Sequence, residues 1–193
     1  MNMVMETRSD NMKVFTAPEE VIIEDDEIAV FLAGGICNCP DWQKEAINQL
    51  RTIEENGEDL SHLVVFNPRR ENFPIDDPSA SEVQIKWEFD MLNQANIFSM
   101  YFCNSPSDQP ICMYELGRNL MKHSKELVVI TVEEGYRRKN DVIIQTELAT
   151  TSNDVVRVVN DSLEESCKDH ALRILKIYKK VCFCRRIKGS IIK

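Results

Sequence analysis

The sequence contains no apolar run long enough to cross a membrane. Its longest uncharged apolar stretches, 28–36 and 128–132, fall well short of the roughly 18 residues that a membrane-spanning helix needs. The first 13 residues are polar, so the sequence shows no signal peptide. With 43% hydrophobic and 28% charged residues the chain can still bury a core, and its 193 residues suit one domain. We therefore expect a soluble, cytoplasmic protein.

Histidine is scarce, and the cysteines lack the spacing of a metal site. None of the three histidines lies near a cysteine pair. The seven cysteines include two C-x-C pairs, Cys37 with Cys39 and Cys182 with Cys184, whereas structural zinc sites usually have C-x-x-C or C-x-x-H spacing. In a chain without a visible signal peptide, these thiols are expected to be free and in a reducing compartment. The sequence therefore predicts no metal site.

Positive charge is scarce outside the C-terminal segment. The net charge is −9, but residues 168–193 hold nine Lys or Arg and one Asp, so the remaining 167 residues carry −17. An acidic body repels nucleic-acid phosphates, which argues against nucleic-acid binding along the chain. The basic segment is expected to be a solvated helix face with a loose end, although contact with a phosphate, an acidic partner or a membrane surface stays open.

Short apolar segments alternate with amphipathic ones along the chain. This alternation predicts an α/β fold with a mostly parallel five-stranded sheet and right-handed crossovers. The expected strands are 28–34, 63–66, 97–102, 127–132 and 155–159, and the expected helices run from about 40 to 57, over 83–94, 113–123 and 142–148, and from about 162 to 182.

One domain is expected over 28–182. Residues 1–27 are interpreted as an acidic extension, in which 13–15 and 21–23 could add a small hairpin or an edge strand. Residues 183–193 are interpreted as a basic C-terminal tail.

Parallel α/β sheets bind ligands beyond the carboxyl ends of their strands, so residues that follow a strand are the first candidates. Gly34 and Gly35 end the first strand, where they either let a ligand approach the backbone or form a tight turn. They do not belong to a G-x-G-x-x-G dinucleotide motif. Glu115 follows the third strand at the expected start of a helix, whose dipole would keep the carboxylate ionised. A plain helix-start glutamate is the alternative, and Gly117 would allow close packing beside it.

A second carboxylate, Glu88, lies on the preceding helix beside Trp87. At the edge of an apolar face it is either a solvated neighbour or a functional group. Paired with Glu115, it would supply the nucleophile and proton donor that glycoside chemistry uses.

Five motifs occur in a fixed order and together carry a family resemblance. They are VFLAGGICNCPDWQ (30–43), FNPRR (66–70), QIKWEFDMLNQANI (84–97), QPICMYELG (109–117) and YRRKNDV (136–142). Over about 28–145 the chain resembles nucleoside 2-deoxyribosyltransferase-like proteins. The resemblance implies a flavodoxin-like, or Rossmann-like, sheet and cleavage of the N-glycosidic bond of a nucleoside or nucleotide. It also implies a homo-oligomer whose neighbouring subunit completes the site, and no cofactor, since glycosyl transfer through a carboxylate needs none.

The resemblance also implies roles for particular residues. The glutamate of the E-L-G motif, here Glu115, is the nucleophile at the anomeric carbon, and Glu88 matches the acidic residue that handles protons near the base. The expected substrate contacts are Phe31, Gly34, Gly35, Asp41, Trp42, Asn67, Arg69, Gln109 and Tyr114.

The chain departs from the family pattern at three places. Asn96 stands where an Asp is common, Cys112-Met113-Tyr114 precede the E-L-G motif in place of a Gly or a hydroxyl residue, and Gln109 replaces an acidic residue. These changes leave open a transferase, a hydrolase, a nucleotide-level substrate and an inactive site. A non-catalytic binder of an ADP-ribose-like ligand is the alternative function, and an adaptor acting through the basic helix is a third.

Two arginine pairs bear on the substrate. Arg69, Arg70, Arg137 and Arg138 could bind a 5′-phosphate or ADP-ribose bidentately. Salt bridges at the surface or at a subunit interface are the alternative for each of them.

Overall fold

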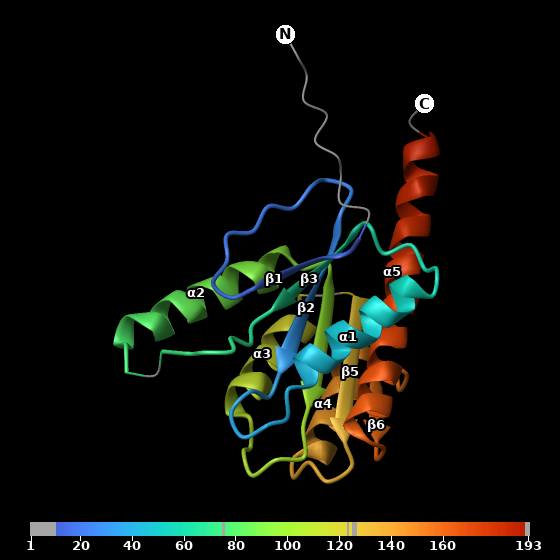
Figure 1. Cartoon of the computed structure of the whole chain (residues 1–193). Coiled ribbons are helices and arrows are strands. Elements are labelled where there is room, and N and C mark those ends of the chain that lie inside the picture. The colour runs from blue at the N-terminus through green and yellow to red at the C-terminus, as the bar shows by residue number, and fades with distance from the viewer. Residues whose placement is uncertain (1–10, 75, 123, 125–126, 192–193) are drawn as a thin grey trace.

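The computed structural model describes residues 11–74, 76–122, 124 and 127–191, and it contains a six-stranded parallel sheet (Figure 1). The strand order is β1-β3-β2-β4-β5-β6. The strands are β1 (Lys13–Thr16), β2 (Ile28–Gly34), β3 (Leu63–Asn67), β4 (Ile97–Phe102), β5 (Val128–Glu133) and β6 (Val156–Val159). The helices are α1 (Trp42–Glu55), α2 (Pro78–Gln94), α3 (Pro110–Leu120), α4 (Lys139–Thr150) and α5 (Leu163–Ile191).

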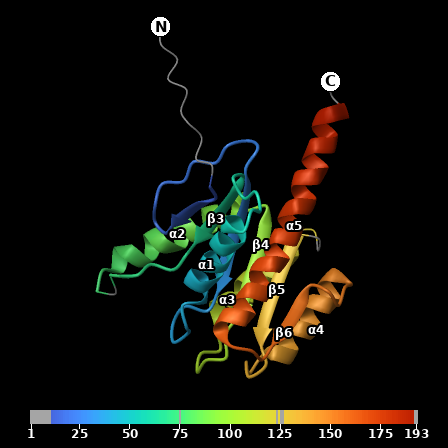
Figure 2. The ribbon, with the colours of Figure 1, turned by 45° about the vertical axis from the view of Figure 1, so that its right-hand side comes forward.

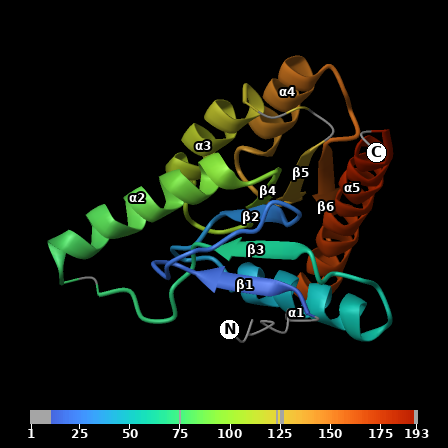
Figure 3. The same ribbon diagram turned by 90° about the horizontal axis from the view of Figure 1, so that it is seen from above.

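Helices cover both faces of the sheet. Helices α1 and α5 lie on the face turned toward the viewer in Figure 2, and α2, α3 and α4 lie on the other, as the view from above shows (Figure 3). Strand β2 is buried along nearly its whole length because alternate side chains enter the two cores: Phe31 packs on the α2–α3–α4 side and Leu32 on the α1–α5 side. The predicted flavodoxin-like α/β fold is confirmed.

The prediction of five strands is wrong by one, because Lys13–Thr16 forms an edge strand. β1 pairs in parallel with β3, from Lys13 beside Val64 to Thr16 beside Asn67. Its four residues are only half-buried, so the sequence carries little hydrophobic signal there. The edge-strand alternative for 13–15 is confirmed, whereas 21–23 has no regular structure.

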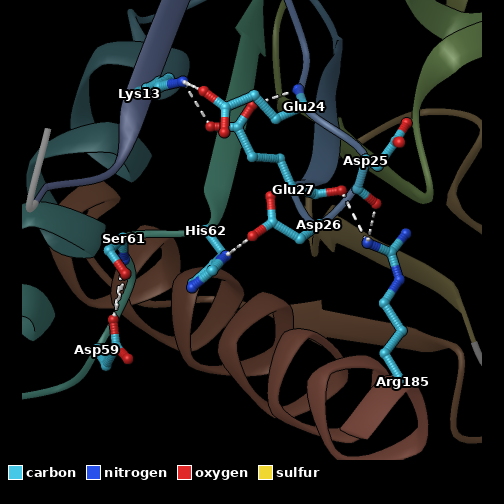
Figure 4. Close-up of polar contacts among 9 residues, drawn as sticks. All are labelled: Lys13, Glu24, Asp25, Asp26, Glu27, Asp59, Ser61, His62 and Arg185. Carbon is cyan, nitrogen blue, oxygen red and sulfur yellow. Dashed lines mark hydrogen bonds and ion pairs between the residues drawn. The ribbon is translucent and has the colours of Figure 1, made fainter. Parts of the chain in front are cut away.

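Ion pairs and hydrogen bonds attach the segment after β1 to the rest of the fold (Figure 4). Lys13 Nζ lies 2.6 Å from the buried carboxylate of Glu27, and this hydrogen bond raises the pKa of the lysine. His62 Nδ1 lies 3.4 Å from Asp26, just before β3. Residues 24–27 thus contact both β1 and the start of β3.

Helix α5 continues nine residues past its expected end at 182 and reaches Ile191. Arg185 explains part of this extension, since its guanidinium donates to the carbonyl oxygens of Asp25 (3.3 Å) and Glu27 (3.0 Å). Most of the predicted tail is therefore helix. Residues 192–193 of that tail and 1–10 of the predicted extension lie outside the described residues. In the part of the chain that is described, no helix combines the length and the apolar character of a membrane span.

Two helices on the α2–α3–α4 side begin earlier than expected because each has a proline in its first turn, where the missing N–H costs nothing. Helix α2 begins at Pro78, with Asp77 as N-cap, rather than at 83. Helix α3 begins at Pro110 rather than at 113. Glu115 is therefore the sixth residue of α3, in its second turn, and the expectation of a first-turn carboxylate is wrong.

Candidate active site

A cavity of about 220 Å³ opens at the carboxyl end of β2. Its walls come from the end of β2, the turn before α1, the middle of α2 and the first turns of α3. After β2 the chain adds β3 on one side, and it later adds β4 on the other, so the strand order reverses here. Such a reversal is where open parallel sheets bind ligands. Six of the predicted site residues line the cavity: Phe31, Gly34, Gly35, Glu88, Gln109 and Glu115.

The two predicted carboxylates reach the cavity from different helices. Glu88 comes from α2 and Glu115 from α3, and both are half-buried. Burial, and then the charge of Glu88, raises the pKa of Glu115 to about 7, while the charge of Arg118 opposes the shift. Burial also raises the pKa of Glu88. The cavity thus disfavours negative charge on either carboxylate, and a charge on Glu88 makes ionisation of Glu115 harder.

Gln84 holds the Glu88 carboxylate in place. Its side-chain Nε2 donates to Glu88 Oε1 (2.7 Å) and to the carbonyl oxygen of Pro68 (2.7 Å). Gln84 is buried one helical turn before Glu88. This role was not predicted from the sequence, although the spacing of four residues on a predicted helix was the available signal.

Gly34 and Gly35 form a wall of the cavity that tolerates no side chain. Gly34 has a φ of +152°, and a Cβ there would lie 2.3 Å from the carbonyl oxygen of Tyr101 and 2.7 Å from the Trp42 ring. A Cβ on Gly35 would lie 2.4 Å from Cys39 Sγ and 2.5 Å from Gln109 Oε1. Close packing inside the protein therefore requires glycine at both positions.

Trp42 supports this wall from behind rather than lining it. The indole is fully buried, its Nε1 donates to the carbonyl oxygen of Gly35 (3.0 Å), and it stacks on Tyr101 with ring centroids 5.0 Å apart. Trp42, expected as a substrate contact, is therefore not among the residues that line the cavity.

Gln109 presents a hydrogen-bond acceptor at the cavity. Its φ of 48° places it in the left-handed region just before α3, and its Nε2 donates to the carbonyl oxygen of Cys103 (2.8 Å). The Oε1 atom is buried and has no hydrogen-bond partner among the residues that the structure describes. A ligand donor such as a hydroxyl or an N–H would satisfy it.

The other predicted contacts lie outside the cavity lining. Arg69 donates to the carbonyl oxygens of Pro40 (2.7 Å) and Cys39 (3.1 Å) and ties the turn before α1 to the end of β3. Asp41 caps α1 by accepting from the Lys44 N–H (3.0 Å). The Asn67 side chain accepts from the Arg69 N–H (3.0 Å), and Tyr114 is 68% exposed on α3.

The remaining arginines have partners on the surface. Arg70 lies over the ring of Phe73, 5.4 Å from its centroid. Arg137 pairs with Asp108 at 2.6 Å, and Arg138 lies 3.6 Å from Asp141. Ion pairing, the alternative to phosphate binding, is thus what the structure shows for Arg137 and Arg138.

Other lining residues were not among the predicted contacts. The exposed Cys37 and the buried Cys112 add thiols, and burial, then the Glu115 charge, raises the pKa of Cys112. Both lie in motifs already singled out, so their neighbours carried the signal. Close packing at Gly117 is not found, because a Cβ there would meet no described atom within 4 Å.

Within the described ranges, no group of three or more His, Cys, Asp or Glu side chains is placed to hold a metal ion.

A family described as nucleoside 2-deoxyribosyltransferase like matches residues 27–136, which is more than half of the chain. No curated protein matches the chain significantly.

Proposed function

Because the chain belongs to the nucleoside 2-deoxyribosyltransferase-like family, we propose that it is an enzyme that cleaves, or transfers across, the N-glycosidic bond of a nucleoside or its 5′-monophosphate. Glu115 is the nucleophile and Glu88 the acid and base. The observation that supports this assignment is that two carboxylates from separate helices line one cavity, at the switch point of the sheet.

The proposed reaction has two steps. The ionised Glu115 attacks the anomeric carbon while the bond to the base nitrogen breaks, and the electron pair of that bond goes to the base. The protonated Glu88 gives its proton to the leaving base. A second base, or water, then attacks the anomeric carbon, its proton returns to Glu88, and the ester to Glu115 breaks.

Both steps of this reaction depend on which carboxyl carries a proton. Burial raises the pKa of Glu88, so its carboxyl holds a proton to higher pH than a glutamate in water does. A pKa of about 7 leaves Glu115 ionised in about half of the molecules at neutral pH. We therefore expect a bell-shaped pH profile, limited on the acid side by ionisation of Glu115 and on the alkaline side by loss of the last proton of the pair.

Mass spectrometry of substrate pools tests the proposal. The protein is incubated with pooled deoxynucleosides, ribonucleosides, their 5′-monophosphates and NAD, and free base, free sugar and exchanged nucleosides are followed. Free base without exchange would establish a hydrolase, and exchange would establish a transferase. We expect Glu115→Gln to lower the rate about a thousandfold or more. The matched control is Glu164→Gln, at an exposed position on α5 across the sheet, and it should keep full activity.

Other outcomes would contradict the assignment. Full activity in Glu115→Gln would remove the nucleophile role. Tight binding of a nucleotide derivative that is recovered unchanged, with no effect of Glu115→Gln, would instead favour the non-catalytic binder.

We also infer that a second copy of the chain packs on the α2–α3–α4 side. Large apolar side chains of these elements are exposed, and exposed apolar side chains gathered on one side of a protein often mark an interaction site. Gly117 lies on the same helix as two of them, and a Cβ there would meet nothing within 4 Å among the described residues, so the helix can approach a partner closely at this point. The exposed apolar residues are Val83, Ile85 and Phe89 of α2, Ile111 and Tyr114 of α3, Met121 at the C-cap of α3, and Ile144 and Leu148 of α4.

A further inference from the structure

Arg118 lies on α3 three residues after Glu115, so the two side chains project from neighbouring positions on one side of the helix. It is half-buried, and its guanidinium carbon lies 4.7 Å from the centroid of the Phe89 ring on α2. Phe89 directly follows Glu88. The Arg118–Phe89 contact therefore joins the two helices that carry the cavity's carboxylates, beside those carboxylates.

The Phe89 ring holds the guanidinium of Arg118 in place, but one of its buried nitrogen donors has no acceptor among the described residues. Stacking on an aromatic ring fixes its plane while leaving its N–H groups free to donate. Its Nη2 atom is buried and has no hydrogen-bond partner among the described residues. A buried donor without an acceptor is costly, and an ionised carboxylate one helical turn away would lower that cost.

Several titratable groups lie around Glu115. Glu88 faces it from α2, and Cys112 lies on its own helix; the thiol of Cys37 lines the same cavity from the turn after β2. Burial and Glu88 raise the pKa of Glu115, and the charge of Arg118 acts in the opposite direction.

A second cation, which follows α3, is engaged elsewhere. Lys122 Nζ donates to the carbonyl oxygens of Leu92 and Asn93, both at 3.1 Å. Burial, and then the charge of Arg118, lowers the pKa of Lys122.

We propose that Arg118 is a positioning residue that keeps Glu115 ionised, and that its stacking on Phe89 holds the guanidinium where it does so. This inference rests on the proposed function, in which Glu115 attacks as a carboxylate. Arg118 does not line the cavity, so it acts on the reaction through Glu115 and not on the substrate.

The pH dependence of kcat/KM tests this role. In Arg118→Gln the acid limb of the profile should move to higher pH by about one unit, the effect of removing a neighbouring opposite charge. Below that limb the variant should be about tenfold slower than the wild type, and at high pH the two should converge. Arg118→Lys keeps the charge and should restore most of the original profile. Arg51→Gln removes an exposed arginine on α1, across the sheet, and should leave the profile unchanged.

A direct titration separates this inference from the proposed function. The ¹³C carboxyl signal of Glu115, assigned with Glu115→Gln, should titrate at higher pH in Arg118→Gln than in the wild type, whether or not any substrate is turned over. An active enzyme in which the signal does not move, or in which Arg118→Gln loses activity equally at every pH, overturns the inference alone. A shifted signal in a protein that cleaves no nucleoside overturns the proposed function and leaves the inference standing.

Discussion

Replacing Gly34 by alanine tests whether the glycine wall of the cavity is held by sterics. Two separate costs meet at this position. Its φ of +152° is a backbone conformation that residues with a Cβ rarely adopt, and the added Cβ would lie 2.3 Å from the carbonyl oxygen of Tyr101. That oxygen belongs to β4, the neighbour of β2, so it cannot move without disturbing the centre of the sheet.

The two costs can be separated by a second glycine. Gly57 also has a positive φ, +98°, but a Cβ there would meet no described atom within 4 Å. Gly57→Ala should therefore lower the free energy of unfolding only through its strained backbone conformation, by about 1–2 kcal/mol. In Gly34→Ala the backbone strain should lower the free energy of unfolding by about 1–3 kcal/mol, and the clash should lower it by a similar amount. The total loss should therefore be about 2–6 kcal/mol.

Thermal unfolding followed by circular dichroism measures the difference. For a chain of this size the melting temperature should fall by about 2–8 °C in Gly57→Ala and by about 4–24 °C in Gly34→Ala. Gly34→Ala should also lose activity, because the Trp42 ring that supports the wall would be displaced. Equal melting temperatures in the two variants would show that the wall yields easily, and the steric argument would fail.

Three further predictions concern charge and assembly. His170 is buried between the hydroxyls of Ser99 and Thr131, and burial lowers its pKa to about 3. Its ring signals in NMR spectra should therefore stay constant from pH 8 to pH 5. The free energy of unfolding should decrease as the pH falls below about 6.5, because the His170 ring takes up a proton in the unfolded state and not in the folded state. Burial raises the pKa of Glu115, so the folded state should lose stability as the pH rises from about 4.5 to about 7. In urea unfolding, Glu115→Gln should be about 1–3 kcal/mol more stable than the wild type at pH 8 and equal to it at pH 4. Equal stability of the two proteins at both pH values would contradict the burial argument. Met121 is 83% exposed on the apolar side, so Met121→Arg should lower the mass measured by light scattering if copies associate there, and an unchanged oligomer would place the interface elsewhere.

The fold could be predicted from the sequence where strands are buried on both faces. Residues 28–34 and 97–102 were predicted with the bounds that the structure has, since continuous apolar runs of this length have few other solutions. The edge strand at Lys13–Thr16 carries no such signal, because its pairing with β3 is made by the backbone. The end of α5 was missed for a similar reason: it is held by hydrogen bonds from Arg185 to backbone carbonyls, which no periodicity reveals.

The candidate site was predictable where local sequence determines position, and less so where packing does. Glu115 and the glycine pair line one cavity, as expected for residues that follow the carboxyl ends of neighbouring strands, and Glu88 reaches it from the middle of α2. Trp42 and Arg69 lie in the same motifs, but the indole packs beneath the wall and the guanidinium binds carbonyl oxygens. The motif places such residues near the site, but the packing decides whether each of them faces the ligand or supports the wall.

The raised pKa of Glu115 bears on the chemistry as well as on stability. A shift from 4.5 to about 7 corresponds to about 3 kcal/mol of unfavourable free energy in the ionised carboxylate. In the proposed reaction the anomeric carbon gains positive charge as the glycosidic bond breaks, and the Glu115 charge is then neutralised in an ester. The environment that disfavours the isolated carboxylate therefore favours both the cationic transition state and the covalent intermediate relative to it. Burial beside Glu88 would thus raise the reactivity of the ionised Glu115. The charge of Arg118 would have two opposite effects: it increases the fraction of Glu115 that is ionised at neutral pH, and it lowers the reactivity of each ionised carboxylate.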